Sequence, residues 1–441
     1  MPRHEARSTA PVPERAILVG VDHPRQEWPI AESMAELERL ACTDGAEVVA
    51  TYVQRLDHPV PKTFIGSGKV EEIAAAVRRL DADVVIFDDE LTPSQQSNLE
   101  GALGEPTKVI DRCALILDIF GNHARTRAGR LQVQLAQLQY LYPRLRGMWS
   151  HLVGEQTRGG IGSRFGQGES QLEVDRRLIR NKIHALKNDL KTLAVRREVQ
   201  GKARHESGVW RVALAGYTNA GKSTLLNALS GSDVYAKDEL FATLDPTTRM
   251  VELDEGRRIV ITDTVGFIQK LPTTLVESFK STLAEIRSAD LVLKVVDASD
   301  KNAEAQLACV DDILRQIGAH EVASVVVLNK SDAAQPSDLA ALEAANPGCE
   351  TISALTGAGM SSLTWRIAHE ASERERVVSV LVPYDKGSLM NEIHQTGQVL
   401  RESYEQGGTR VTARVNARLA AHLECYALAD DSEAGEAPQD A

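Results

Sequence analysis

A nine-residue stretch, GYTNAGKST at 216–224, combines the residue types and the spacing that hold phosphate groups. It matches G-x-x-x-x-G-K-[ST] and stands between an apolar, strand-like run and a helix-forming run. Glycines let successive backbone N–H groups point at phosphate oxygens, and the following helix adds its positive N-terminal end. We therefore expect Lys222 to contact the β- and γ-phosphates of a nucleotide and the Ser223 hydroxyl to bind Mg²⁺.

Two further segments have the residues needed to sense a terminal phosphate and its metal. DTVG follows an apolar run, so we expect Asp263 to reach Mg²⁺ through a water molecule and the Gly266 N–H to touch the γ-phosphate. Within FATLDPTTR, Thr243 is the best candidate for the second protein ligand of Mg²⁺. Thr247 and Thr248 of the same stretch are alternatives, because spacing alone does not separate them.

The sequence NKSD at 329–332 closes an apolar run and indicates which base is bound. The Asp332 carboxylate can accept hydrogen bonds from N1–H and the N2 amino group of guanine, whereas adenine places an acceptor at N1 and leaves the carboxylate unpaired. Ser353, Ala354 and Leu355, at the end of the next strand-like run, would add a backbone N–H toward guanine O6. The order of these motifs predicts a site for a guanine nucleotide.

The residue after DTVG bears on how the nucleotide is hydrolysed. A water-orienting glutamine often follows this motif, but Phe267 stands there, and a phenyl ring cannot orient water. Hydrolysis then relies on another group, a partner or a bound monovalent cation, and the unassisted rate should be low. Asn219 is the candidate ligand for K⁺ near the β/γ bridge, where negative charge develops, and an asparagine that only stabilises the loop is the alternative. Lys222, Asn219 and Gly266 are the predicted catalytic residues.

The residues expected to contact the nucleotide come from these motifs, with Ser223 and Thr243 as the metal ligands. They are Gly216, Tyr217, Thr218, Asn219, Ala220, Gly221, Lys222, Ser223, Phe241, Ala242, Thr243, Leu244, Asp245, Asp263, Thr264, Val265, Gly266, Asn329, Lys330, Ser331, Asp332, Ser353, Ala354 and Leu355.

The composition is that of a soluble globular protein. The chain has 441 residues, 43% hydrophobic and 25% charged, a length that suits roughly two to four domains. No apolar run approaches the roughly 18 residues of a membrane span, and the N-terminus lacks the apolar core of a signal peptide. We therefore expect a cytoplasmic location, and a monomer. The five cysteines are widely spaced without a C-x-x-C pair, which indicates reduced packing residues rather than disulfides or a zinc site.

Basic residues are concentrated in one segment. Residues 125–204 contain 17 Lys and Arg against 6 Asp and Glu, although the whole chain has a net charge of −12. A basic segment in an acidic protein is expected of an element that binds a polyanion. A solvated helix face is the alternative.

The pattern of apolar residues predicts the elements that position the motifs. Strand-like and helix-like runs alternate over 15–124, which predicts an α/β domain with a largely parallel sheet. Two apolar stripes with helical spacing then predict an antiparallel helical hairpin, whose first helix ends at Pro143 and whose second begins at Leu172. RGGIGSRFGQGES, at 158–170, fits neither pattern and is interpreted as a basic loop at the tip, with a flexible linker as the alternative.

We therefore expect an α/β protein with six segments. They are a disordered N-terminus (1–14), an N-terminal parallel-sheet α/β domain (15–124), a basic helical hairpin with a Gly-rich loop (125–205), a P-loop G domain (206–374), a small C-terminal α+β domain (375–428) and an acidic disordered tail (429–441).

The nucleotide motifs GYTNAGKST, LFATLDPTTR, DTVGFI and NKSD occur together with three upstream stretches, FIGSGKVEEI, VIDRCALILDIF and GGIGSRFGQGESQLEVDRR. In this combination the chain resembles, over nearly its whole length, the HflX family of bacterial GTPases, which belong to the translation-factor-related class. The upstream stretches are far more specific than the GTPase motifs, which many families share. The family loop usually reads G-x-R-G-P-G-E, whereas here Phe165 is inserted and Gln167 replaces the proline.

The resemblance implies an N-terminal α/β domain with a helical hairpin, a central G domain, and association with the large ribosomal subunit and its rRNA. Family members separate stalled or heat-damaged ribosomes into subunits and hydrolyse GTP faster on ribosomes, and some also hydrolyse ATP through the N-terminal domain. Carried over by motif, Ser223 and Thr243 are the Mg²⁺ ligands, and Asn329, Asp332 and 353–355 bind guanine.

The leading hypothesis is a GTPase that binds the large ribosomal subunit and, in its GTP form, splits or rescues stalled ribosomes, with slow hydrolysis unless ribosomes stimulate it. The alternative is a GTP-dependent regulatory switch that binds a protein partner through the helical hairpin. Charge reversal at Arg176, Arg177 and Arg180 would separate the two, because only the first requires these charges for ribosome binding.

Overall fold

The structure, a computed structural model, describes residues 13–24, 26, 28–156, 165–206, 209–231, 241, 246–253, 257–270, 280–373 and 375–427. By their contacts these residues form two compact units. The first contains the described residues up to Ala194 together with Phe241, 268–270 and 280–281, and the second contains the remainder.

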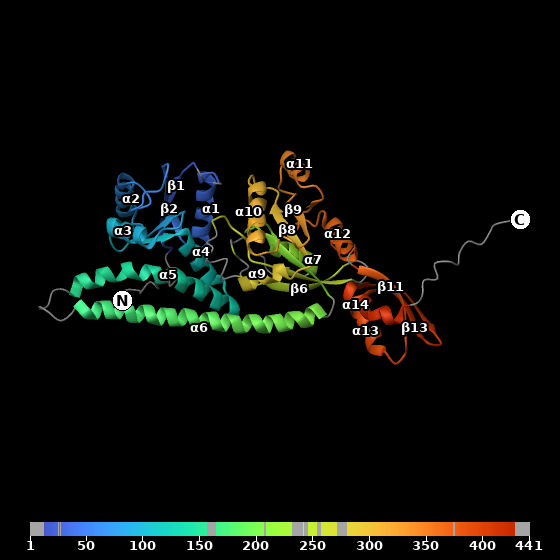
Figure 1. The fold of residues 1–441 in the computed structure, drawn as a ribbon. Coiled ribbons are helices and arrows are strands. Elements are labelled where there is room, and N and C mark those ends of the chain that lie inside the picture. Colours follow the sequence, from blue (N-terminus) through green and yellow to red (C-terminus); the bar gives the residue numbers. More distant parts are fainter. Residues whose placement is uncertain are drawn as a thin grey trace, which may run out of the picture. The chain divides into compact units, whose positions relative to one another are not determined.

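The first unit begins with a four-stranded sheet in which all strands are parallel, in the order β2-β1-β3-β4. This is the arrangement that the alternation of strands and helices predicted. Its core is formed by apolar side chains such as Ile17 and Phe87 of the strands with Ile73 and Leu99 of the helices. The elements are β1 (Arg15–Asp22), α1 (Ile30–Thr43), β2 (Glu47–Arg55), α2 (Ser67–Leu80), β3 (Val84–Phe87), α3 (Pro93–Leu103), β4 (Lys108–Asp111) and α4 (Arg112–His123) (Figure 1).

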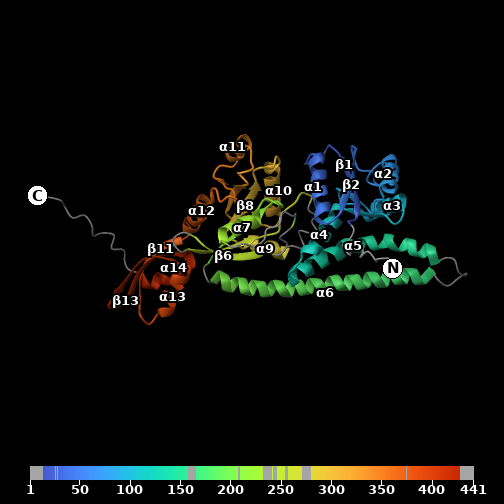
Figure 2. The ribbon, with the colours of Figure 1, turned by 180° about the vertical axis from the view of Figure 1, so that it is seen from behind.

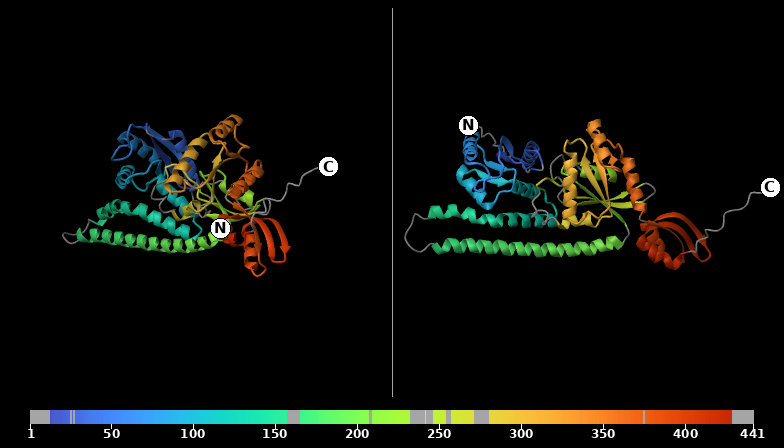
Figure 3. Two further views of the ribbon diagram at one scale, coloured as in Figure 1. Left: turned by 45° about the vertical axis from the view of Figure 1, so that its right-hand side comes forward. Right: turned by 45° about the horizontal axis from the view of Figure 1, so that its top comes forward.

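A helical hairpin follows. Helices α5 (Arg127–Gln156) and α6 (Phe165–Glu206) run antiparallel and lie side by side (Figure 3). Within the first unit, Arg180 Nη2 of α6 donates a hydrogen bond to the Tyr142 hydroxyl of α5 at 2.8 Å. The guanidinium groups of Arg176 and Arg180 lie 5.8 and 5.9 Å from the centre of the same ring, so the two helices are joined by cation–π contacts as well.

Two expectations about the hairpin are wrong. Pro143 lies inside α5 and does not end it. Helix α6 begins at Phe165, so the second half of the expected loop, Phe165–Ser170, is helical. Residues 157–164, which include the remainder of that loop, lie outside the described residues.

The helix continues past the proline because the next residue is firmly held. Arg144 donates to the Leu91 carbonyl at 2.7 Å, to Asp111 at 3.1 Å and to Gln96 at 3.0 Å. Its guanidinium also lies 3.5 Å from the ring centre of Tyr140. These contacts offset the roughly 3 kcal/mol that an interior proline costs a helix.

The second unit contains a six-stranded sheet in the order β10-β9-β8-β5-β7-β6, in which only β6 is antiparallel to its neighbour. Its core includes Val212, Leu214, Ile261 and Leu293 of the strands and Leu225 of the first helix. The elements are β5 (Trp210–Gly216), α7 (Lys222–Ser230), β6 (Thr247–Glu252), β7 (Arg258–Asp263), α9 (Lys280–Arg287), β8 (Leu291–Asp297), α10 (Ala303–Gln316), β9 (Ser324–Asn329), α11 (Pro336–Ala345), β10 (Glu350–Thr351) and α12 (Met360–Glu373).

A three-stranded antiparallel sheet, in the order β11-β13-β12, forms the C-terminal part of the described chain. Helices α13 and α14 lie on one face of this sheet (Figure 2). The elements are β11 (Glu375–Val382), α13 (Gly387–Thr396), β12 (Gln398–Glu405), β13 (Gly408–Asn416), α14 (Ala417–Leu423) and a 3₁₀ turn (Glu424–Tyr426).

The cysteines are free thiols, as expected, but not all of them pack. Cys113 is buried, whereas Cys42 and Cys425 are exposed, so the interpretation of all five as packing residues is wrong. Burial raises the pKa of the Cys113 thiol. Across the described part of the chain, no helix has both the length and the apolar character to cross a membrane.

Candidate functional site

The sequence motifs meet at one edge of the six-stranded sheet. Five of its strands are parallel, so their C-terminal ends share that edge. The phosphate-loop motif, the DTVG segment and NKSD start at the last residues of β5, β7 and β9, and 353–355 come after β10. The fold therefore brings the described residues of these four motifs together, although they are spread over 140 residues of sequence.

Close contacts explain why glycine stands at one position of the phosphate loop and at one of the DTVG segment. Gly221 has a φ of +90°, and a Cβ at this position would lie 2.2 Å from Asn329 Nδ2. A Cβ on Gly266 would lie 2.9 Å from Thr218 Cγ2 and 3.1 Å from Lys222 Nζ. Any larger residue at either position would displace the groups that surround the predicted phosphate site.

The loop lysine is buried and held by backbone carbonyls. Lys222 is 6% exposed, and its ammonium group donates to the carbonyl oxygens of Gly216 at 3.1 Å and Tyr217 at 2.7 Å. Burial lowers the pKa of Lys222 to about 8, and the negative charge of Asp263 acts in the opposite direction. A phosphate beside the ammonium group would raise this pKa again, because an anion favours the charged form.

Two of the residues expected around the metal lie next to each other. The Ser223 hydroxyl donates to Asp263 Oδ2 at 2.7 Å, and Asp263 is buried. A hydroxyl and a carboxylate are the hard oxygen groups that suit Mg²⁺, so this pair fits the predicted ion. Thr243 lies among residues 242–245, outside the described residues, together with Ala242, Leu244 and Asp245.

The DTVG segment is tied to the phosphate loop by backbone hydrogen bonds. Phe267 N–H donates to the Gly216 carbonyl at 3.0 Å, and Thr218 N–H donates to the Phe267 carbonyl at 2.7 Å. The Thr264 hydroxyl donates to the Leu214 carbonyl at 2.6 Å. Sequence reasoning considered Phe267 only for its ring, but its backbone joins the two segments that are expected to surround the γ-phosphate.

The predicted base-binding motif is organised by a buried asparagine. Asn329 is 2% exposed; its Nδ2 donates to the Ala220 carbonyl at 2.9 Å, and its Oδ1 accepts from Ala354 N–H at 3.0 Å. Ser331 N–H donates to the Ile352 carbonyl at 3.1 Å. These bonds hold the phosphate loop, NKSD and 353–355 in one arrangement.

Two residues of this region face solvent. Asp332 is exposed, and Leu355 is 81% exposed, so both are accessible to a base at the sheet edge. Lys330 adopts a positive φ of 61°, and its ammonium group pairs with Asp297 at 2.6 Å. Sequence reasoning missed Asp297. Its position at the end of β8 could have indicated it, because β8 lies between β5, which leads into the phosphate loop, and β9, which ends at NKSD.

One residue predicted to contact the nucleotide has a different environment. Phe241 belongs to the first unit, where its buried ring packs edge-on against Phe120, with ring centres 4.6 Å apart. Its side chain is thus used for packing in the first unit.

The residues after DTVGF also belong to the first unit. Lys270 pairs with Asp88 at 2.5 Å and with Asp89 at 2.7 Å, and the Gln269 amide donates to Glu36. Asp88 and Glu36 in turn pair with the buried Arg112. The chain therefore passes directly from the predicted γ-phosphate sensor into a buried ionic cluster, which sequence reasoning did not identify.

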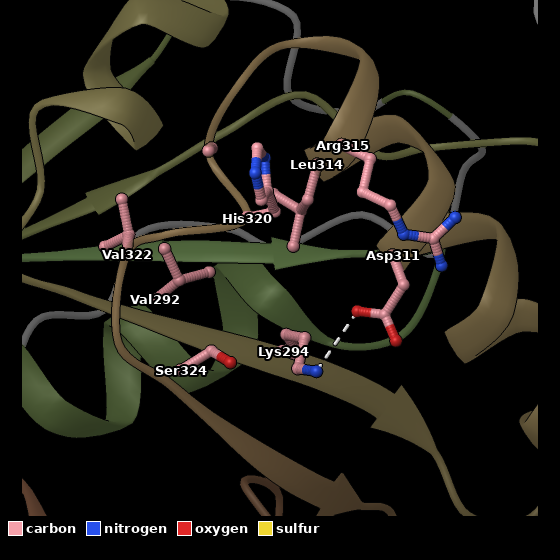
Figure 4. A pocket seen from close by; sticks show the side chains of 9 residues that line it. Val292, Lys294, Asp311, Leu314, Arg315, His320, Val322 and Ser324 are labelled. Atoms are coloured by element: carbon pink, nitrogen blue, oxygen red, sulfur yellow. Dashed lines mark hydrogen bonds and ion pairs between the residues drawn. The ribbon is translucent and has the colours of Figure 1, made fainter.

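A separate pocket of about 180 Å³ lies on the six-stranded sheet beside α10 (Figure 4). In it, Lys294 pairs with Asp311 at 3.1 Å. Val292 and Ser324, which line the pocket, lie near the N-terminal ends of β8 and β9. The pocket is therefore at the opposite end of the strands from the motifs, and it is no part of their site.

Comparison with known proteins identifies the family. Residues 211–330 match the model of a 50S ribosome-binding GTPase, residues 31–121 match the N-terminal region of a GTP-binding GTPase, and residues 123–204 match its middle region. A GTPase HflX from Caldanaerobacter subterraneus subsp. tengcongensis is 44% identical over 416 residues, which cover 94% of this chain and 94% of the relative. The chain belongs to the HflX family of GTPases. The HflX of Escherichia coli K12 is 40% identical over 90% of this chain and 92% of its own. A GTP-binding protein from Sulfolobus solfataricus, solved in complex with GDP, covers 82% of this chain and 99% of its own, with 22% identity and a TM-score of 0.43.

Proposed function

We propose that this HflX protein is a GTPase that binds the large ribosomal subunit and, in its GTP form, splits or rescues stalled ribosomes. The observation that carries the nucleotide part is the Asn329 side chain, which joins the phosphate loop to the 353–355 segment through Ala220 and Ala354. The ribosome part is supported by the match of residues 211–330 to a 50S ribosome-binding GTPase and by the basic hairpin.

In this proposal each side chain or backbone amide of the site contacts one part of the nucleotide or one of its ions. The loop amides and Lys222 bind the phosphates, Asp332 selects guanine, and Gly266 N–H contacts the γ-phosphate. Mg²⁺, which Ser223 and Thr243 would hold, would supply positive charge to the phosphate oxygens. Asn219, exposed in the loop, would bind K⁺ where charge develops between the β- and γ-phosphates.

Exposed basic side chains around α6 supply the proposed contact with rRNA. Arg177, Lys182 and Lys187 are exposed on this helix, whereas Arg176 and Arg180 contact Tyr142 and help to join the hairpin. Phosphate contacts of this kind release counterions, so the affinity should fall steeply as salt is raised.

The test is a pelleting experiment with purified large subunits and the nucleotide-free, GDP and non-hydrolysable GTP-analogue forms. We expect the GTP-analogue form to co-sediment most strongly, less so at high salt, and large subunits to raise GTP turnover above its slow basal rate. Equal co-sedimentation of the GDP and GTP-analogue forms would overturn the proposal. Release of subunits from 70S particles, followed on a sucrose gradient, tests the splitting step.

A protein partner for the hairpin is the second candidate, because α6 also exposes apolar side chains. Val174 is 42% exposed, and Leu178, one turn later on the same side of the helix, is 58% exposed. The Arg177→Glu, Lys182→Glu, Lys187→Glu variant separates the two functions without disturbing the contacts at Tyr142. Loss of large-subunit binding favours the ribosome, whereas intact binding favours the protein partner.

A further inference from the structure

Among the residues that the structure describes, helices cover only one face of the three-stranded C-terminal sheet. The alternate residues Val380, Val411 and Ala413 are buried against α13 and α14, together with Ile393 and Leu423 of those helices. Because side chains alternate along a strand, the residues between them project from the opposite face. The cross-strand register therefore defines the composition of that open face.

The open face carries an arginine in three of the four rows that join β12 to β13, and the fourth row pairs Glu405 with Gly408. In successive rows Gln398 lies opposite Arg414, Arg401 opposite Thr412, and Ser403 opposite Arg410. Each of these three rows combines one guanidinium group with a hydroxyl or an amide.

The third strand extends the same face without adding a charge. Val377, Ser379 and Leu381 of β11 lie opposite Arg414, Thr412 and Arg410. The nine positions in these three rows contain three arginines, no carboxylate and no aromatic ring, and the row beyond them adds one carboxylate, that of Glu405.

The arginines are close together and mostly uncompensated. Arg401 is diagonal to both Arg410 and Arg414, which places their Cβ atoms roughly 7–8 Å apart. Arg410 pairs with Glu405, at the end of β12, at 2.7 Å. Within the described chain, Arg401 and Arg414 have no ion-pair partner. Like charges at this spacing repel one another, so an anionic ligand would stabilise the face.

We propose that this open face binds the phosphate backbone of double-stranded RNA. The inference rests on the proposed ribosome binding and adds a second contact to that of the hairpin. Guanidinium groups bind phosphates through paired N–H donors, and the neighbouring hydroxyls and amide can donate to further phosphate oxygens. A duplex is favoured over a single strand, because single strands are bound by stacking bases on aromatic rings, and the nine positions have none.

The probe is a fluorescein-labelled RNA duplex of about 20 base pairs, titrated with the full chain in its GTP-analogue form. Anisotropy gives the affinity from 50 to 200 mM KCl. The variant Arg401→Gln, Arg410→Gln, Arg414→Gln removes the three charges from solvent-facing positions. The matched control, Lys62→Gln, Lys301→Gln, Arg315→Gln, removes three exposed charges elsewhere. Unchanged GDP affinity and thermal melting confirm that each variant is folded.

The face variant is expected to bind the duplex at least tenfold more weakly at 100 mM KCl. Its plot of log affinity against log salt should be shallower by about 2–3, near 0.9 for each lost phosphate contact, and the control should match the wild type. If the face variant has the same duplex affinity and salt slope as the wild type, the inference is overturned. That result is also expected if the face binds an acidic protein instead of RNA. Pelleting with large subunits, run in parallel, reports separately on the proposed function. A wild-type protein that fails to pellet counts against ribosome binding, whereas the salt slopes with the duplex still decide whether the open face binds RNA.

Discussion

Asn329 joins two parts of the nucleotide site that are far apart in sequence. Its side-chain Nδ2 donates to the Ala220 carbonyl at 2.9 Å, and its Oδ1 accepts from Ala354 N–H at 3.0 Å. The residue is buried, so neither backbone group has water as an alternative partner. The phosphate loop and the base-binding segment are therefore held in register by one side chain.

Replacing this residue should weaken nucleotide binding without changing base preference. In Asn329→Ala two buried backbone groups lose their partner, at about 1–3 kcal/mol each, so GDP affinity should fall by roughly a hundredfold. Asp332→Asn is the matched comparison: it should lower GDP affinity but allow xanthosine diphosphate to bind, because an amide N–H can donate to the second carbonyl of xanthine. Titration of both variants with fluorescent nucleotides measures this. Unchanged GDP affinity in Asn329→Ala would show that the bridge does not organise the site.

The depressed pKa of Lys222 predicts a pH dependence of binding. Burial lowers this pKa to about 8 in the free protein, and a bound phosphate raises it, so the nucleotide prefers the protonated form. Affinity should be constant below pH 7 and fall about tenfold between pH 7 and 9, as the free lysine loses its proton. Lys222→Arg, whose guanidinium stays charged, should bind with less pH dependence over the same range. A wild-type GDP affinity that stays constant to pH 9 would contradict the burial argument.

The proposed K⁺ role of Asn219 can be separated from a backbone role. Asn219 has a φ of 61°, which asparagine tolerates better than most residues and glycine adopts freely. GTP turnover is expected to be faster in KCl than in NaCl for the wild type. In Asn219→Gly the loop conformation is preserved but the amide oxygen is lost, so the difference between the two salts should disappear. If the glycine variant keeps the K⁺ stimulation, the side chain only stabilises the loop.

The elements around the site could be predicted because their signals are local. The helix-forming run after GYTNAGKST is α7 (Lys222–Ser230), and the alternating runs over 15–124 are the strands and helices of the four-stranded sheet. The apolar residues of α4 (Arg112–His123) are nearly continuous, so the sequence shows no amphipathic stripe that would predict a helix there. A proline inside a helical pattern indicates a helix end, and the sequence alone does not show otherwise at Pro143. The contacts of Arg144 that outweigh the proline involve residues of other elements, which the local pattern does not reveal.

The sequence predicts the motifs of the site better than it predicts the side-chain pairs between them and their surroundings. Motif spacing places residues at one sheet edge, because parallel strands present their C-terminal ends together. It does not predict that Asp297 pairs with Lys330, or that Gln269 and Lys270 leave the site and join the first unit. Such pairs join residues distant in sequence, and they depend on how the elements pack.

The buried cluster around Arg112 should be important for the stability of the first unit. Arg112 is 2% exposed and pairs with Glu36 at 2.5 Å and Asp88 at 2.6 Å, and Ser33 donates to Asp88 at 2.6 Å. Arg112→Met leaves the buried Glu36 without its cation and Asp88 with Lys270 alone, which should destabilise the unit by about 3–5 kcal/mol. Amide hydrogen exchange in β1 and β3 measures the loss, because these strands are in the core. The matched control is the surface pair of Lys69 and Glu72, where Lys69→Met should change protection by less than about 1 kcal/mol.

The same cluster predicts an acid dependence with a definite sign. Burial acts to raise the pKa of Asp88, but Arg112 and Lys270 outweigh it, so this pKa lies below its ordinary value of 3.8. A lowered pKa contributes stability above the ordinary value and loses it only as pH falls through the lowered one. The contribution of Asp88 to the protection of the β1 and β3 amides, corrected for the intrinsic exchange rate, should therefore stay level from pH 7 to about 5 and decline only below about 4. In Arg112→Met the uncompensated carboxylate should instead take up a proton at higher pH, so the variant should approach the wild type in stability as the solution is acidified. A variant that stays equally destabilised at every pH would show that lost packing, and not the unpaired charge, causes the effect.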